Sequence, residues 1–373
     1  MKKINAEPYI STYLHNKGRK LGLPIAGNFE LTARCNFNCP MCYVHLTQEQ
    51  VDATGRELTA QEWLDIAKSA KDKGMVFALL TGGEPLVRKD FFEIYEGMQK
   101  MGLMVSINSN GFLIHGQNLK KLLDDPPSRV NISLYGGCNE TYRQMCGVDA
   151  YHRVKENIAQ LKAAGVNVSL NLCMTPYNKE DLAQIHADAV ALNVNVRATG
   201  YMYPPVRVNG EQYGTAVRLS PEDAAKYELE WDRLRMGDEV ISERAREMCA
   251  DLEDGCGRNP NSVGTGVTCR AGGTSFWITW DGKMLPCGML TAPSADPLQD
   301  GFAEAWLQIR QKTSQIRMPD KCAGCGMRNA CGVCAAVCVT ETGKFDGVPE
   351  YMCRKTEEKI RLLREAGQMR NDS

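Results

Sequence analysis

The stretch Ala33-Arg-Cys-Asn-Phe-Asn-Cys-Pro-Met-Cys-Tyr43 places Cys35, Cys39 and Cys42 at C-x3-C-x2-C spacing on one short loop. Three thiolates this close together can hold three corners of a metal cluster, because soft sulfur ligands suit iron–sulfur clusters and zinc. A structural metal site is normally closed by a fourth protein ligand. The spacing therefore predicts a cluster whose fourth corner is open to a bound molecule. The alternative is a loop of three cysteines without metal.

Apolar runs and amphipathic segments alternate on both sides of this loop. Thr59 and Glu62 form a capping-box pair at the start of one helix, and Gly74 ends it. The run Met75–Leu80 is continuously apolar, as expected of a parallel strand covered on both faces. The pattern predicts strands at 28–33, 75–80, 103–108, 130–134, 166–172 and 194–198, and helices at 59–74, 89–101, 117–123, 151–164 and 179–192. With right-handed crossovers, six such units form an α/β fold, a partial (β/α)6 TIM-like barrel.

Polar and glycine-rich turns follow several of the predicted strands, at the ends where barrel active sites collect. In Thr81-Gly-Gly-Glu-Pro85, the glycines allow close approach of the backbone to a ligand, and Glu84 can accept hydrogen bonds from an ammonium group. Asn108-Ser-Asn-Gly111 and Ser133 end the next two strands. Simple turn formation is the alternative for each of these segments.

The C-x3-C-x2-C loop followed by Gly82-Gly83-Glu84-Pro85 resembles the signature of the radical S-adenosylmethionine (radical SAM) enzymes, over about residues 28–200. The resemblance implies that Cys35, Cys39 and Cys42 hold a [4Fe-4S] cluster whose open iron is chelated by the amino and carboxylate groups of SAM. Met41 stands where the family usually has an aromatic residue beside the adenine, and Tyr43 is next to it.

The resemblance also implies the contacts to SAM. Gly82–Pro85 would hold the methionine amine, and Asn108, Asn110 and Ser133 would contact the ribose and the carboxylate. Tyr135 replaces an acidic residue that many family members have, and Cys146 occupies a usual position of the arginine that pairs with the SAM carboxylate. Arg143 and Arg197 are the candidates for that pairing, with surface or packing arginines as the alternative.

A second group of cysteines has the spacing Cys269-x12-Gly282-x4-Cys287, then Cys322-x2-Cys325-x5-Cys331-x2-Cys334-x3-Cys338, and finally Cys353. It resembles the SPASM extension, which implies two auxiliary [4Fe-4S] clusters. Cys334 lies one residue early and Cys338 is extra, so Cys334, Cys338 and Cys256 all remain candidates to complete the first auxiliary cluster. A zinc ribbon is the alternative, because C-x2-C pairs also suit zinc.

The remaining segments complete the predicted organisation. Trp280-Asp281-Gly282-Lys283 is similar to the family's hairpin between the first two ligands, and Asp281 is either the catalytic proton acceptor or a turn residue. Ser220 caps a helix of about 15 residues after a long loop at 199–219. We expect an N-terminal lead-in at 1–27, the radical SAM barrel at 28–236, a bridge at 237–268, the SPASM domain at 269–353 and a C-terminal helix at 354–373.

The net charge and the distribution of apolar residues argue against functions on nucleic acid or in a membrane. The net charge of −1 on 373 residues gives no electrostatic case for nucleic acid or an anionic membrane. No apolar run approaches the roughly 20 residues of a membrane span, and no apolar stretch follows the basic start. Without a signal peptide, the sixteen cysteines indicate metal ligands in a reducing cytoplasm.

The resemblance implies reductive cleavage of SAM to methionine and a 5′-deoxyadenosyl radical, which removes a hydrogen atom from the substrate. The auxiliary clusters favour a net two-electron oxidation, and the expected product is a modified or cross-linked ribosomal peptide or protein side chain. The alternatives are a dehydrogenase or epimerase acting on a small molecule (a sugar, amine or cofactor precursor) and a non-catalytic iron–sulfur electron carrier. Residues 1–27 are too short for a leader-binding domain, so either a separate leader-binding protein presents the peptide, the leader binds the edge of the barrel, or the substrate is small. A separate leader-binding protein is therefore one expected partner. A flavodoxin- or ferredoxin-type electron donor is the other.

Overall fold

A computed structural model describes residues 6–205, 217–253 and 266–368. Its centre is one sheet with the strand order β6-β5-β4-β3-β2-β1-β7-β8. The first six strands pair in parallel and in chain order, which confirms the predicted α/β partial barrel. The strands are β1 (Ala26–Glu30), β2 (Phe77–Thr81), β3 (Met104–Ser109), β4 (Arg129–Ser133), β5 (Val168–Cys173), β6 (Asn195–Thr199), β7 (Ser275–Ile278) and β8 (Met284–Leu285).

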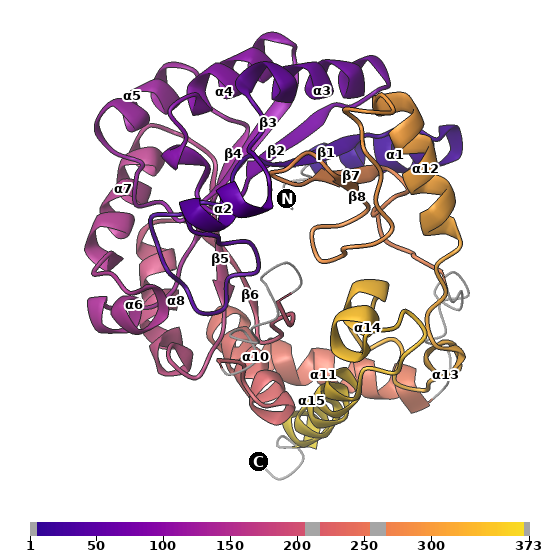
Figure 1. Cartoon of the computed structure of the whole chain (residues 1–373). Coiled ribbons are helices and arrows are strands. Elements are labelled where there is room, and N and C mark those ends of the chain that lie inside the picture. The colour runs from indigo at the N-terminus through magenta and orange to yellow at the C-terminus, as the bar shows by residue number, and fades with distance from the viewer. Residues whose placement is uncertain (1–5, 206–216, 254–265, 369–373) are drawn as a thin grey trace.

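The helices between these strands cover the outer face of the sheet (Figure 1). Thr59 and Glu62 form the predicted capping box at the start of α3. The helices of this layer are α3 (Ala60–Asp72), α4 (Phe91–Lys100), α5 (Gly116–Asp124), α7 (Tyr151–Ala163) and α8 (Leu182–Ala191). Shorter elements at the strand ends are α2 (Gln48–Thr54), α6 (Asn139–Cys146) and the 3-10 turns η1 (Pro85–Val87) and η2 (Lys179–Asp181).

The sequence pattern predicted six strands, the first of which is β1. In the structure the sheet continues beyond β1 with two further strands, β7 and β8. β7, from the second cysteine region, pairs in parallel with β1, so that Ala26 lies opposite Ser275. Phe276 is fully buried and packs edge-on against Phe29, with the ring centroids 5.9 Å apart. The side chain of Asn28 adds a 2.8 Å hydrogen bond to the Phe276 carbonyl. The second cysteine region is therefore built onto the barrel rather than suspended beside it.

The N-terminal segment, expected to be an irregular lead-in, forms helix α1 (Ala6–Leu21). It packs beside the second cysteine region, near helix α12 (Phe302–Ser314) (Figure 1). His15 Nδ1 lies 2.8 Å from Thr274 Oγ1, and Trp306 donates a 2.8 Å hydrogen bond to the Gly22 carbonyl. Because these partners lie more than 250 residues away, the local pattern gave little sign of the helix.

Three long helices close the lower edge of the molecule in Figure 1. They are α10 (Pro221–Met236), capped by Ser220 as expected, α11 (Asp238–Glu253) and α15 (Glu350–Gln368). The bridge at 237–268 is therefore helical in its first half, because Ile241 and Ala245 are buried against Leu363 and Ala366. The shorter helices α13 (Asp320–Ala323) and α14 (Ala335–Thr342) complete the cysteine-rich region.

Some expectations fall outside the described residues, namely Cys256 and much of the 199–219 loop. The domain boundaries stay predictions. None of the helices that the structure describes has the length and apolar character needed to cross a membrane.

Candidate functional site

A cavity of about 660 Å³ lies at the C-terminal ends of the barrel strands. We call it the barrel cavity. One wall is the cysteine loop, and another is formed by residues at the ends of β2 to β6. The facing wall comes from the second cysteine region and α15, through Met289, Gly332, Val337, Met352 and Lys355. Both halves of the chain therefore enclose one space.

Most of the residues expected to hold a cluster and SAM line this cavity together. They are Cys35, Cys39, Met41, Cys42, Tyr43, Gly82, Gly83, Asn108, Asn110 and Ser133. They come from four different strand ends, so the arrangement depends on the sheet. Their roles as ligands stay predictions.

The loop thiols are partly covered and accept hydrogen bonds from N–H groups. The Phe37 amide donates to Cys35 Sγ at 3.4 Å, and the His45 amide donates to Cys42 Sγ at 3.3 Å. Burial raises the pKa of Cys35 to about 12 and that of Cys42 to about 11. Contact with Cys146, followed by burial, raises the pKa of Cys39. A positive metal centre favours deprotonated thiols at such sites, and N–H donors to sulfur are typical surroundings of iron–sulfur clusters.

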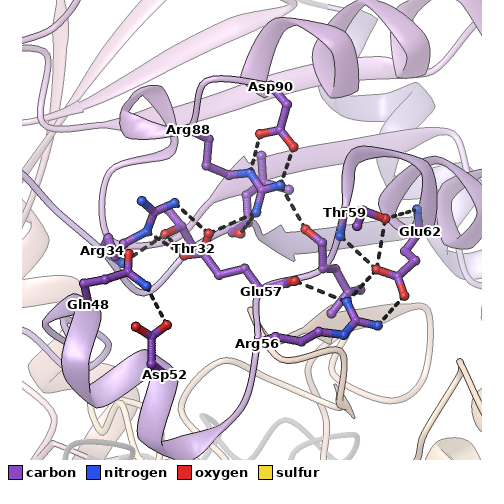
Figure 2. Close-up of polar contacts among 12 residues, drawn as sticks. Thr32, Arg34, Gln48, Asp52, Arg56, Glu57, Thr59, Glu62, Arg88 and Asp90 are labelled. Atoms are coloured by element: carbon purple, nitrogen blue, oxygen red, sulfur yellow. Dashed lines mark hydrogen bonds and ion pairs between the residues drawn. The ribbon is translucent and has the colours of Figure 1, made fainter.

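A network of hydrogen bonds and ion pairs holds the start of this loop in place (Figure 2). The guanidinium of Arg34, the residue before Cys35, donates to both carboxylate oxygens of Glu57 at 3.0 and 2.7 Å. Thr32 also donates to Glu57. Arg88 is almost fully buried, with 4% of its side chain exposed, and donates to the Leu31 carbonyl at 2.9 Å and to Glu57 at 3.3 Å. The network fixes the direction in which the chain leaves β1 and enters the cysteine loop.

The expected role of Glu84 as the acceptor for an ammonium group stays a prediction, and its carboxylate is not among the groups that line the barrel cavity. Glu84 is fully buried and accepts hydrogen bonds from Ser109 Oγ at 3.0 Å and from the Asn110 amide at 2.7 Å. Burial raises its pKa to about 7. Glu84 therefore ties the turn after β2 to the end of β3, and Pro85 begins η1.

Gly82 and Gly83 are needed for close packing of two backbone segments. A Cβ at Gly83 would lie 2.3 Å from the Arg34 carbonyl oxygen, and one at Gly82 would lie 2.5 Å from the Thr32 carbonyl oxygen. The Gly83 amide donates to that Thr32 carbonyl at 2.8 Å. The glycines thus hold the turn against the strand that leads into the cysteine loop, while their remaining surface faces the cavity.

The polar residues at the strand ends are mutually oriented. Asn110 donates to Asn36 Oδ1 at 2.9 Å and to Cys35 Sγ at 3.7 Å. Asn108 accepts a 2.9 Å hydrogen bond from Asn131. These contacts hold the amide groups in place at the cavity wall beside the loop thiols.

Three other candidates lie away from the barrel cavity. Arg143 is an exposed side chain paired with Glu140 and, at 2.9 Å, with Asp149, so the expected contact to a SAM carboxylate is not supported. Arg197 is exposed on the sheet-edge strand β6 and is absent from the cavity lining. Asp281 sits at the tip of the predicted β7–β8 hairpin, where its carboxylate accepts a 2.5 Å hydrogen bond from Thr279. A turn role fits Asp281, and the structure gives it no contact with the cavity.

The second group of cysteines separates into two sets. A cavity of about 30 Å³ is lined by four of them, Cys322, Cys325, Cys331 and Cys353. The other set gathers around Tyr203, whose hydroxyl lies 3.7 Å from Cys334 Sγ. Burial and the nearby Cys334, Cys287 and Cys269 raise the pKa of Tyr203. Two sets agree with the expectation of two auxiliary clusters.

Cys338 is fully buried in α14, among apolar residues. Among the described residues, no three His, Cys, Asp or Glu side chains form a group that could hold a single metal ion.

Some residues of the cavity had no signal in the sequence. Asn171, Cys173 and Thr199 end β5 and β6, and Lys355 projects from α15. Lys355 looked like one of many charged residues in a surface helix. Only the packing of α15 against α10 brings it to the cavity.

Comparisons with known proteins agree with this geometry. Residues 29–189 match the model of the radical SAM superfamily, whose cofactors are a [4Fe-4S] cluster and SAM, as expected from the sequence. An AdoMet-dependent heme synthase of Oleidesulfovibrio alaskensis is 26% identical over 338 residues, which cover 84% of this chain and 83% of the synthase. A probable GTP 3′,8-cyclase of Saccharolobus islandicus is 36% identical over 167 residues, 44% of this chain and 53% of the cyclase. The chain thus spans about half the length of that cyclase.

Two solved structures share the fold. SuiB of Streptococcus suis, bound to its precursor peptide SuiA, has a TM-score of 0.65 at 16% identity and covers 95% of this chain and 82% of SuiB. The enzyme anSMEcpe with bound AdoMet has a TM-score of 0.67 at 17% identity and covers 93% of this chain and 100% of anSMEcpe. At these identities the likeness concerns the fold, including the cysteine-rich region after the barrel.

Proposed function

Because residues 29–189 belong to the radical SAM superfamily, we propose that this chain cleaves SAM reductively and oxidises a peptide or protein side chain. The observation that carries the proposal is the barrel cavity. Cys35, Cys39 and Cys42 meet the ends of the five strands β2 to β6 there, and the second cysteine region forms the opposite wall. The volume of about 660 Å³ lies within the range of cofactor and ligand sites.

The residues fit the implied cofactors. Three thiols, of which Cys35 and Cys42 accept hydrogen bonds from backbone N–H groups, suit a [4Fe-4S] cluster with one open iron. The amides of Asn108 and Asn110 face the same space. When bound, the cluster and SAM supply a radical that removes a hydrogen atom from an unreactive C–H bond. The chain's own residues orient these groups: the Glu57 network fixes the loop, and Glu84 fixes the strand-end turn.

The walls of the cavity suit an extended, partly apolar substrate. Tyr201 and Tyr203 line it, with their ring centroids 4.9 Å apart, next to Met202 and Met352. Aromatic and methionine side chains provide adaptable apolar contact area. Peptide-bound SuiB supports a peptide substrate by analogy of fold only. Reduction by a flavodoxin- or ferredoxin-type donor, an additional leader-binding protein and a cytoplasmic location remain part of the proposal.

The test uses anaerobically reconstituted protein with dithionite and SAM, with 5′-deoxyadenosine measured by mass spectrometry. We expect its formation by the wild type and its loss in the Cys35→Ala/Cys39→Ala/Cys42→Ala variant. Cys138→Ala is the matched control, because this exposed cysteine is absent from the cavity lining. Deoxyadenosine formed by the triple variant would contradict the assignment. Co-expression with candidate precursor peptides, followed by a search for a loss of about 2 Da, then tests the substrate.

A small-molecule oxidation is the second candidate. The heme synthase match over 84% of this chain favours it, because that relative is similar across both halves. Unchanged peptides, together with deoxyadenosine formation stimulated by a small molecule, would select this alternative.

A further inference from the structure

Of the described side chains that line the barrel cavity, one carries a formal charge, apart from the cysteine thiols. Among the described residues that line it, the polar groups are asparagines, serines, threonines and tyrosines, and the rest are apolar apart from the thiols and glycines. Lys355 is the exception. A buried ammonium needs partners that accept hydrogen bonds from all its N–H groups, so any N–H that the protein leaves unused favours an accepting, negatively charged ligand group.

An ion pair with Glu228 holds the Lys355 ammonium in place. Its Nζ lies 2.6 Å from Glu228 Oε2 on α10, and only 12% of its side chain is exposed. Glu228 is itself held in place, because its Oε1 accepts a 2.8 Å hydrogen bond from the Gly200 amide just after β6. An ammonium has three N–H donors. The contact with Glu228 uses one of them, so the other two can serve a ligand in the cavity.

Lys355 lies on the far side of the cavity from the cysteine loop. The loop follows β1, whereas Glu228 and Gly200 position Lys355 near β6. In the strand order β6-β5-β4-β3-β2-β1, these two strands are the first and the last of the parallel barrel strands. The lysine is therefore placed to bind the substrate rather than the cofactor held beside the cysteine loop.

We propose that Lys355 is the substrate anchor of this cavity and binds a carboxylate of the substrate. This proposal rests on the proposed function, and it names the chemical class of the substrate. Lys355 and Glu228 together carry no net charge, so a substrate carboxylate adds a single negative charge to the cavity. A phosphate dianion would add two negative charges to an apolar space that has no second cation among its described residues. The carboxylate belongs either to the C-terminus of a peptide or to an acidic side chain.

Two matched pairs of probes test the proposal on the full chain, reconstituted and saturated with SAM. N-acetyl-phenylalanine and its amide test the C-terminal carboxylate. N-acetyl-Glu-Phe-amide and N-acetyl-Gln-Phe-amide test the side-chain carboxylate. Binding is measured by isothermal titration calorimetry. We expect at least one acid to bind about tenfold more tightly than its neutral partner, as typical for a charge-assisted hydrogen bond.

The variants separate binding from folding. Lys355→Met should abolish the preference for the acid, and Lys355→Arg should retain it. Lys355→Met/Glu228→Gln removes the carboxylate that Lys355→Met would leave unpaired, and this variant should also lose the preference. Lys359→Met, on the same helix and outside the cavity lining, should keep it.

Three outcomes would overturn the proposal. The first is a wild type that binds acids and amides equally or binds neither acid at millimolar concentration. The second is a Lys355→Met/Glu228→Gln variant that keeps the preference. The third is a loss of SAM affinity in Lys355→Met with an unchanged acid preference, which would assign the lysine to the SAM carboxylate. Deoxyadenosine formation by the wild type is measured separately, so failure of the proposed function is distinguishable from failure of the anchor.

Discussion

Individual residues at this site act mainly by holding others in position. Glu84 is fully buried, and its carboxylate accepts hydrogen bonds from Ser109, the Asn110 amide and the Leu86 amide. Desolvation still outweighs these contacts and raises its pKa to about 7. The folded chain therefore binds the Glu84 proton more tightly than the unfolded chain does. This difference stabilises the fold fully below pH 4.5, the pKa of the unfolded chain, and the stabilisation is lost as the pH rises through about 7.

This linkage predicts a pH dependence of stability. As pH rises from 4.5 to 7, the metal-free wild type should lose about 3 kcal/mol of unfolding free energy through Glu84. Glu84→Gln should remove that part of the slope, because glutamine does not titrate. Urea unfolding at several pH values measures it. Parallel pH profiles for the wild type and the variant would contradict the prediction.

At the scale of elements, the cysteine loop depends on the segment between α2 and α3. Glu57 lies on that segment and pairs with Arg34 and with the buried Arg88. The barrel and the second cysteine region join where β7 pairs with β1, and we call this strand pair the seam between the two halves of the chain. Phe276 on β7 is fully buried there. The loop is thus braced by one local segment, and the barrel is extended by a distant one.

Removing the brace should weaken both the fold and the cluster site. We expect Glu57→Ala to cost about 2 kcal/mol of unfolding free energy, because it leaves the buried Arg88 with one carboxylate partner fewer. Iron retained after reconstitution should also fall. Asp72→Ala breaks an exposed ion pair with Lys68 and is the control, with an expected cost of no more than about 0.5 kcal/mol. Equal costs for the two variants would argue against the brace.

The seam between β1 and β7 makes a separate prediction. Phe276→Ala should destabilise the protein by about 3–5 kcal/mol, because the ring is fully buried between Phe29, Phe302 and Trp306. Leu298→Ala, at a side chain that is 43% exposed, should have little effect. Denaturant unfolding compares them. A cost below 1 kcal/mol for Phe276→Ala would mean that the two halves do not share a core at this strand.

At the scale of the whole molecule, the barrel and the cysteine-rich region enclose one cavity between them. The three loop cysteines face it, and the Tyr203 ring connects it to Cys334. The set that includes Cys322 and Cys353 lies around a separate cavity. This layout suits one cluster for SAM and two auxiliary clusters.

The number of expected clusters predicts the iron content of the protein. Three [4Fe-4S] clusters require about twelve irons per chain, and the triple Cys35/Cys39/Cys42→Ala variant should keep about eight of them. Iron and sulfide analysis after anaerobic reconstitution gives both numbers. About four irons together with bound zinc in the wild type would instead favour the zinc ribbon.

The sequence by itself determined the barrel, the cysteine loop and most of the residues around it. Strand–helix alternation is local, and parallel strands deliver their C-terminal ends to one edge of a sheet, so Cys35, Gly82, Asn108 and Ser133 could be grouped without coordinates. The capping box at Thr59 and the cap at Ser220 are equally local.

Only the tertiary structure decided which polar groups face the cavity. Glu84 points inward because Ser109 and Asn110 at the end of β3 and the Leu86 amide on its own turn donate hydrogen bonds to it. Arg143 lies outside because it pairs with Glu140 and Asp149. Lys355 became part of the cavity through Glu228, 127 residues away, and β7 joined β1 across about 250 residues. Such contacts depend on packing between distant segments, and no spacing within either segment encodes them.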